Sequence, residues 1–142
     1  MNQLDERWLT ARHEAGHAVA ALHYCCLVHA SIEPDAMSLG TTRIRVQERQ
    51  DAIVVYCGPL AELDWNQLRS GDEMEVHVVG TDFENLQYLR GIFGNDLQDC
   101  YEEAIRFVSD PLVQQRIDRV AHALLERTRL TADEVRAVVA SC

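Results

Sequence analysis

Residues 6–28 form the longest stretch of the sequence in which apolar residues recur with the 3.6-residue period of a helix. Trp8 and a series of alanines mark one face of this segment. A second face carries two histidines among small residues: His13, Gly16, His17, Ala20 and Tyr24. A helix of this length near the start of the chain favours a mainly α architecture.

Residues 30–46 follow a different pattern, because apolar and polar residues alternate there as they do in strands. The alternation covers Ser31–Glu33 and Thr41–Val46, and residues 34–40 between them contain a proline and a glycine that are typical of a turn. We therefore predict one small β element over about residues 30–46.

The rest of the chain reads as a loop at 67–80 and a series of further helices. Two capping boxes support helix starts, one at Thr81 with Glu84 and one at Thr131 with Glu134. Pro111 after Asp110 suits the first position of a helix of about 17 residues. The other expected helices are Gln50–Asn66, with Gly58–Pro59 inside it as a kink or break, Thr81 to about Phe93, and 96–108. The sequence thus predicts one mainly α (α+β) domain over residues 1–142.

Composition excludes several function classes. The 142 residues have a formal net charge of −10, whereas nucleic acids and anionic membranes bind basic surfaces. All 13 basic residues are arginines, so a Schiff-base lysine and a P-loop lysine are excluded. We therefore expect neither nucleic acid nor a membrane surface as the main partner.

The ends of the chain and its cysteines indicate a cytoplasmic protein. The N-terminus lacks the pattern of a secretory signal, and no stretch has the length of apolar sequence that a membrane span needs. The 5 cysteines include no C-x-x-C pair, so we expect buried free thiols and no disulfide framework.

The sequence His13-Glu14-Ala15-Gly16-His17 is an H-E-x-x-H pattern within the first predicted helix. Residues four apart lie one turn apart on a helix, so both imidazoles can reach one metal ion. Glu14 points in another direction and can contact a metal-bound water. Zinc lowers the pKa of such a water to about 7, and Glu14 can accept its proton as general base.

A catalytic zinc ion takes three protein ligands, and the residue pattern leaves the third one open. The candidates are Glu62, Asp64, His77, Asp82 and Glu84. We expect His23, His29 and His122 to be structural or exposed. Tyr56 and His77 are the candidates for a group that stabilises an oxyanion.

Beyond this motif, the sequence resembles the zinc peptidase domain of the FtsH-type AAA+ proteases. His13–Ala18 is similar to that family's H-E-A-G-H-A, and Gly58–Glu62 is similar to its G-R-A-A-E helix. Thr81–Glu84 is similar to its N-D-L-E helix start, which supplies an aspartate ligand. Further similarities, in the family's order, are Ser31–Asp35, Ser38–Gly40, Val120–Glu126 and Leu130–Val135.

This resemblance implies a helical metallopeptidase domain in which His13, His17 and Asp82 bind zinc and Glu14 is the general base. It makes Glu62 a candidate for holding the other nitrogen of a ligand histidine. It also implies a peptide or unfolded-protein substrate, which could pair with the strand at Thr41–Val46 by β-augmentation. Because nine of the 23 acidic residues lie between Glu48 and Glu84, we expect acidic peptides to be disfavoured.

The sequence also departs from the family pattern. It contains no P-loop, the segment between Val46 and Gln50 is short, and Cys57 and Pro59 replace a glycine and an arginine. We therefore expect a peptidase domain without an ATPase motor in this chain, acting with a separate partner protein or as a homo-oligomer. The alternatives are a metal-stabilised binding or adaptor domain that does not cleave, and a helical interaction domain without metal.

Overall fold

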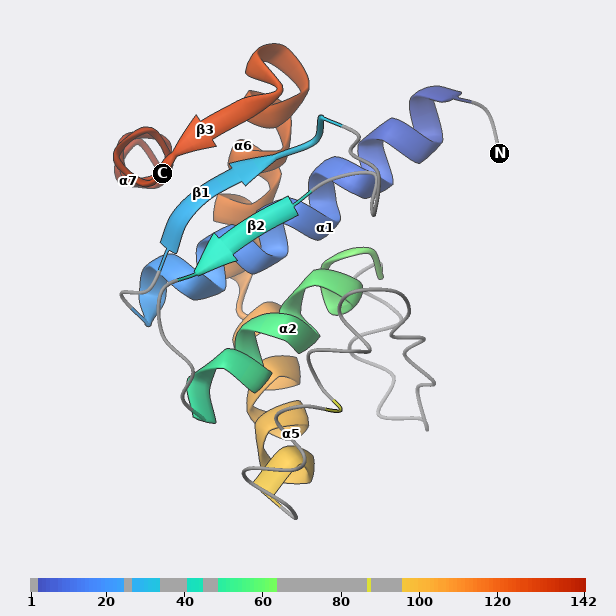
Figure 1. Ribbon diagram of the computed structural model, residues 1–142, viewed down its shortest axis with the longest axis vertical. Coiled ribbons are helices and arrows are strands. Elements are labelled where there is room, and N and C mark those ends of the chain that lie inside the picture. The colour runs from blue at the N-terminus through green and yellow to red at the C-terminus, as the bar shows by residue number, and fades with distance from the viewer. Residues whose placement is uncertain (1–2, 25–26, 34–40, 45–48, 64–86, 88–95) are drawn as a thin grey trace.

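The structure, a computed structural model, describes residues 3–24, 27–33, 41–44, 49–63, 87 and 96–142. These residues form a mainly helical fold with one small antiparallel sheet (Figure 1). The helices are α1 (Gln3–His23), α2 (Arg49–Ala61), α5 (Asp96–Ser109), α6 (Pro111–Arg127) and α7 (Ala132–Ala140). The strands are β1 (Leu27–Ser31), β2 (Thr41–Ile44) and β3 (Arg129–Thr131). The predicted α+β class is confirmed.

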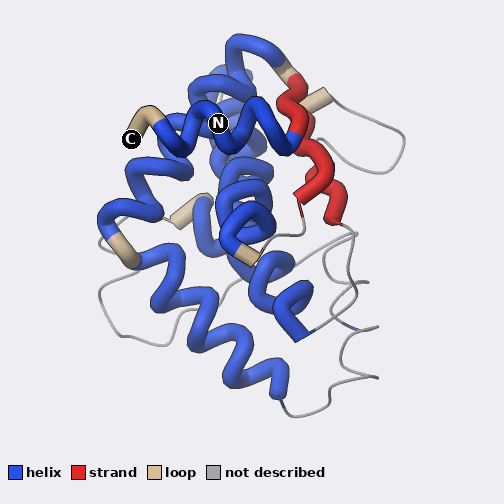
Figure 2. Tube along the Cα trace, turned by 90° about the vertical axis from the view of Figure 1, so that its left-hand side faces the viewer, coloured by secondary structure: helices blue, strands red, loops and turns tan. Residues whose placement is uncertain are grey.

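The sheet has the strand order β2-β1-β3, and both pairings are antiparallel. Ala30 of β1 is the partner of Thr42 in β2 and of Leu130 in β3. A bulge interrupts the pairing between Leu27 and His29. The three strands gather at one side of the helices (Figure 2), and α1 passes both the sheet and α2 (Figure 1).

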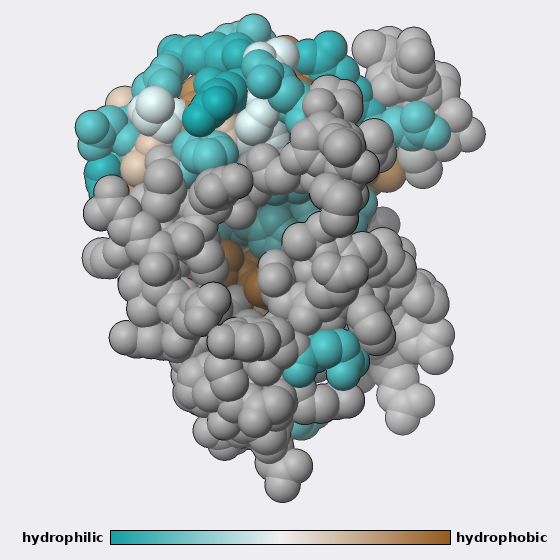
Figure 3. All heavy atoms as spheres, viewed as in Figure 1, coloured by the Kyte–Doolittle hydropathy of each residue, from teal (hydrophilic) through white to brown (hydrophobic). Residues whose placement is uncertain are grey.

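Helix α1 is the centre of the packing, because it contacts α2, α6, α7 and the strands β1 and β2. Its buried residues are mostly alanines, which let neighbouring elements approach its backbone closely. Larger side chains from the surrounding helices complete the core, among them Ile53, Leu60, Ile117 and Leu124. The described surface in Figure 3 is mostly hydrophilic. Among the described residues, Leu112 is the one exposed large hydrophobic side chain.

The last two helices begin where their capping residues predict. Asp110 caps α6 by accepting hydrogen bonds from the backbone N–H groups of Leu112 and Val113, and Pro111 occupies the first turn. Thr131 and Glu134 form both bonds of the capping box at the start of α7. These two predictions from the sequence are confirmed.

Two element boundaries differ from the predictions, and one strand was not predicted. The first helix was expected to reach residue 28, but α1 ends at His23, and Leu27 and Val28 belong to β1. Ile32 and Glu33 were expected to belong to the first strand, but β1 ends at Ser31. A local apolar pattern does not separate the end of a buried helix from the start of a buried strand. The strand β3 was not predicted at all, because three residues are too few to show alternation.

Helix α2 also differs, since it continues through Gly58 and Pro59 to Ala61 without a break. A proline removes one backbone hydrogen bond of a helix and crowds the carbonyl four residues before it, but only two residues of α2 follow Pro59. The predicted strand residues Arg45 and Val46, the end of the predicted second helix at 64–66 and the loop at 67–80 lie outside the described residues. Of the helix expected from Thr81, the structure describes Gln87, which is helical.

Two further expectations concern the thiols and the membrane. Cys57 and Cys100 are buried free thiols, as predicted, while the free Cys142 is exposed. Among the helices that the structure describes, none combines the length and the apolar character that crossing a bilayer requires.

Candidate metal centre

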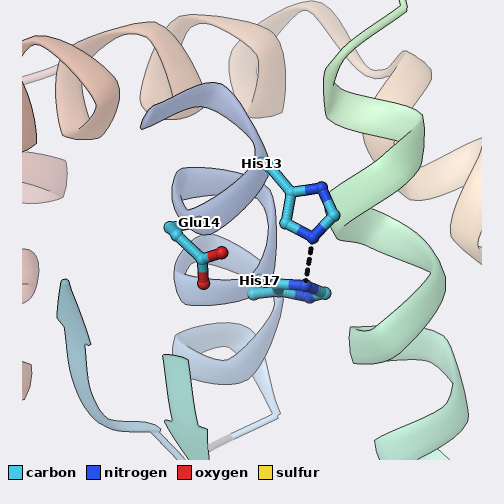
Figure 4. Close-up of side chains that lie close together, drawn as sticks. All are labelled: His13, Glu14 and His17. Carbon is cyan, nitrogen blue, oxygen red and sulfur yellow. Dashed lines mark hydrogen bonds between the residues drawn. The ribbon is translucent and has the colours of Figure 1, made fainter. Parts of the chain in front are cut away.

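His13 and His17 point toward one another from successive turns of α1 (Figure 4). Their Nε2 atoms are 3.0 Å apart. The two rings meet nearly edge to face, with 4.6 Å between their centroids and 80° between their planes. The helical spacing of the motif thus brings two imidazole nitrogens to one point.

The opposite nitrogen of each ring is held by α2 or by the residue that follows it. Nδ1 of His17 lies 2.7 Å from the carbonyl oxygen of Val54, and Nδ1 of His13 lies 3.0 Å from Oε2 of Glu62. A carbonyl oxygen only accepts, so Nδ1 of His17 carries a hydrogen and donates it. An ionised Glu62 imposes the same tautomer on His13.

This tautomer has a direct electrostatic consequence. In the neutral form of each ring, Nε2 then carries a lone pair, and the two Nε2 atoms lie 3.0 Å apart. Two such lone pairs repel each other unless a proton or a cation lies near both. The donor set therefore fits a metal ion of the kind that imidazole binds well, such as zinc.

Glu14 completes a compact group with the two histidines. Its side chain projects from α1 beside both rings (Figure 4), and the residue is only 5% exposed. One potential ligand atom from each of His13, Glu14 and His17 lies within 4.8 Å of the others. These three residues therefore form a group that could hold a metal ion.

Two glycines let α1 and α2 approach closely enough to build this group. A Cβ atom at Gly16 would lie 2.4 Å from the carbonyl oxygen of Cys57 and 2.6 Å from Cβ of Ala61. A Cβ atom at Gly58 would lie 2.3 Å from Nε2 of His17 and 2.9 Å from Nε2 of His13. Neither position has room for a side chain.

The other predicted site residues are only partly within the described structure. Asp82, Asp64, His77 and Glu84 lie outside the described residues, so their roles remain predictions. The ring of Tyr56 packs against Tyr101 of α5, with centroids 5.1 Å apart. His23 packs against Phe107 and His122 against Trp8, with centroid distances of 5.1 and 4.9 Å.

Cys57 neighbours Gly58 in α2, and its thiol is buried. Burial raises the pKa of this thiol far above its usual range, and the negative charge of Glu103 raises it further. The thiol therefore stays protonated at neutral pH. Cys57 does not belong to the group of His13, Glu14 and His17 whose potential ligand atoms lie together.

Three contributors to the site were not identified from the sequence. The carbonyl of Val54 has no side-chain signature, and Gly58 together with Pro59 was interpreted as a kink or break in the helix. A glycine inside a helical pattern can also mark a place where another part of the protein lies close to the backbone. Gly58 is such a glycine, because His13 and His17 lie against it. The third is Arg12, whose buried guanidinium donates a hydrogen bond of 2.9 Å to the carbonyl of Ala61.

Comparison with known proteins agrees with the motif. No family model matches the chain. The ATP-dependent zinc metalloprotease FtsH of Thermus thermophilus is 30% identical over 136 residues, which cover 92% of this chain and 20% of that protein. The chain is a distant homologue of FtsH. The resemblance seen in the sequence is thereby confirmed.

The chain spans about a fifth of the length of that relative, and the motif of His13, Glu14 and His17 relates it to the peptidase region. Among the described residues of this region, His13, Glu14 and His17 form the group that could hold a metal ion. The relative is named a zinc metalloprotease, and two imidazoles with a carboxylate are a donor set suited to that metal.

Proposed function

We propose that this domain is a zinc-dependent metallopeptidase that hydrolyses peptide bonds. One observation supports this above all. The two histidines of an H-E-x-x-H motif, in a chain homologous to FtsH, have their Nε2 atoms 3.0 Å apart, while Val54 of α2 and Glu62, the residue after α2, hold their Nδ1 atoms.

In this proposal His13 and His17 bind zinc through Nε2, and Asp82 is the third ligand, as the resemblance to the N-D-L-E helix start implies. Zinc, when bound, polarises a substrate carbonyl and lowers the pKa of a bound water. Glu62 and the carbonyl of Val54 keep both imidazoles in the tautomer that leaves Nε2 available.

Glu14 is the proposed general base. Its buried carboxylate lies beside both histidines, where it can accept a proton from the attacking water and later donate it to the leaving amine. General acid–base catalysis of this kind contributes about 10²- to 10⁴-fold to a rate.

The proposed substrate is a peptide or an unfolded protein segment, and the proposed compartment is the cytoplasm. Strand β2 lies at one edge of the sheet, and an edge strand can pair with an extended peptide. A separate partner protein, or further copies of the chain, would deliver the substrate. No nucleic acid takes part.

The metal is tested by elemental analysis of protein purified without a His-tag. We expect about one zinc ion per chain, with removal by a chelator abolishing cleavage of casein or of a peptide library. Absence of bound zinc, together with failure to take zinc up from solution, would refute the proposal and favour a helical interaction domain without metal.

The chemistry is tested with Glu14→Gln, which keeps the size of the side chain and removes its basicity. We expect this variant to retain zinc and to lose at least about 10²-fold in cleavage rate. Glu126→Gln, at an exposed position on α6, is the matched control and should cleave normally. A wild-type protein that binds zinc but cleaves no substrate would instead favour the non-catalytic, metal-stabilised binding domain.

A further inference from the structure

Arg12 immediately precedes the first histidine of the motif, yet its side chain is buried and contacts the end of α2 and the helix α6. The residue is only 7% exposed. Arginine is almost never buried unless its charge and its N–H groups have partners. The partners of Arg12 therefore indicate what its burial achieves.

On one side, Arg12 holds the C-terminal end of α2. Its Nε donates a hydrogen bond of 2.9 Å to the carbonyl oxygen of Ala61, the last residue of that helix. The last carbonyls of a helix have no partner within the helix, and the negative end of the helix dipole attracts a cation. Arg12 meets both requirements at once.

The residue after Ala61 is Glu62, whose carboxylate holds Nδ1 of His13 at 3.0 Å. Two neighbouring residues of α1 are therefore tied to two neighbouring residues at the end of α2: Arg12 to Ala61, and His13 to Glu62. A shift of the end of α2 would break both contacts. The position of Glu62 against His13 thus depends on the anchorage of Ala61.

On the other side, Arg12 is itself fixed by α6. Nη1 donates to the carboxylate of Asp118, and Nη2 donates to Oε1 of Gln114 at 2.8 Å. Gln114 in turn donates to the carbonyl oxygen of Val108 in α5 at 2.7 Å. Burial lowers the pKa of Arg12 and Asp118 opposes this effect, and an arginine remains charged in proteins. The guanidinium is held by three bonds in one orientation.

We propose that Arg12 is a positioning residue for the metal centre: by holding the carbonyl of Ala61, it fixes Glu62 against His13 and so raises the affinity of the site for zinc. The inference rests on the zinc site of the proposed function, although it requires no peptidase activity. The H-E-x-x-H motif needs two histidines to bind the metal and a glutamate to act as base, and neither function requires an arginine before the first histidine.

The test measures zinc affinity of the full chain by competition with a chromogenic chelator. In Arg12→Met, which keeps the apolar stem, we expect zinc to bind about tenfold more weakly, within the range caused by loss of partners that orient metal ligands. In Arg12→Lys, which keeps the charge, we expect a similar loss, because one ammonium does not reproduce three fixed N–H directions. The absorption spectrum of the cobalt-substituted protein should change in both variants.

A double-mutant cycle distinguishes positioning from general stabilisation of the fold. Glu62→Ala removes the contact through which Arg12 acts, so adding Arg12→Met to it should lower zinc affinity by less than about twofold. Leu124→Ala, a core substitution in α6 away from Arg12, is the control for lost stability. It should leave zinc affinity unchanged below its unfolding temperature.

Each outcome bears on one claim. An equal loss of affinity from Arg12→Met with and without Glu62 would overturn the positioning role, as would wild-type affinity in both Arg12 variants. If Arg12→Met does not fold, Arg12→Lys takes its place in the double-mutant cycle, and the same comparison of zinc affinity with and without Glu62→Ala tests the positioning role. If the wild-type chain binds no zinc, the proposed function fails first, and the role of Arg12 fails with it.

Discussion

A methyl group on Gly58 would lie 2.3 Å from Nε2 of His17, which is closer than a Cβ atom approaches any neighbour in real proteins. The backbone of α2 therefore passes directly beside the nitrogen that the metal site needs. The absence of a side chain at position 58 is a condition for the two histidines to meet. The same helix supplies the Val54 carbonyl that orients His17.

Gly58→Ala should abolish or strongly weaken zinc binding, because the new methyl group displaces both imidazole rings. Overpacking of this kind costs about 1–3 kcal/mol of unfolding free energy, and we expect zinc affinity to fall by more than about tenfold. Pro59→Ala, at the next residue of the same helix, restores a backbone N–H and should retain zinc. Wild-type zinc affinity in Gly58→Ala would show that the helices separate easily and that this contact is unimportant.

The contrast between the caps and the site shows how much the sequence could predict. The starts of α6 and α7 were predicted correctly because Asp110 and Thr131 act on backbone groups two or three residues away. The H-E-x-x-H helix was predicted for the same reason, since its spacing is local. The fold class followed from these elements.

The parts that could not be predicted depend on residues distant in the chain. Arg12 contacts residues 49 and 106 positions away, and β3 exists because β1 pairs with it. Hydrophobic periodicity is read over about 18 residues at most, so it contains no information about partners this far away in the chain.

Substitutions of Glu62 should weaken zinc binding in a graded order. Glu62→Gln can still accept the hydrogen of Nδ1 of His13 through its amide oxygen, but it provides no negative charge. Glu62→Ala removes the contact altogether. We expect affinity to fall in the order wild type, Gln, Ala, with the Ala variant about 10- to 100-fold weaker. Titration calorimetry with zinc measures this, and equal affinities for all three proteins would remove Glu62 from the site.

Thr128→Gly should stabilise the protein. Thr128 caps the C-terminus of α6 with a φ of 63°, a left-handed conformation that is unfavourable for a β-branched residue and free of strain for glycine. Relief of this strain is worth about 1 kcal/mol, offset in part by loss of the 3.2 Å hydrogen bond from Oγ1 to Glu33.

The matched control for this prediction is Thr128→Val, which keeps the branched Cβ and loses the hydroxyl. We expect it to be less stable than the wild type. Urea unfolding of the three proteins gives their free energies of unfolding. A glycine variant less stable than the wild type would mean that the hydroxyl contacts outweigh the backbone strain, and one less stable than the valine variant would show that the left-handed backbone is not strained by a branched side chain.

The capping box of α7 should make the stability of the protein depend on pH through Glu134. Hydrogen bonds from the backbone and side chain of Thr131 lower the pKa of Glu134 below its ordinary value of 4.5, and the charge of Arg127 contributes in the same direction. A carboxyl with a lowered pKa in the folded state binds fewer protons there than in the unfolded state. Its contribution to stability is therefore present above pH 4.5 and is lost as the pH falls through the folded-state pKa.

The chain has 23 acidic residues, so this contribution must be isolated as a difference between two proteins. We expect the wild type to be more stable than Glu134→Gln at pH 7, and the difference to shrink steadily below pH 4.5 in urea unfolding experiments. In a Thr131→Ala background, which itself costs about 1 kcal/mol, the pH dependence of that difference should become smaller but persist, because the backbone N–H of residue 131 still donates to the carboxylate of Glu134. An NMR titration that places the pKa of Glu134 at or above 4.5 in the folded protein would contradict the whole prediction, because the capping bonds would then not favour the ionised form.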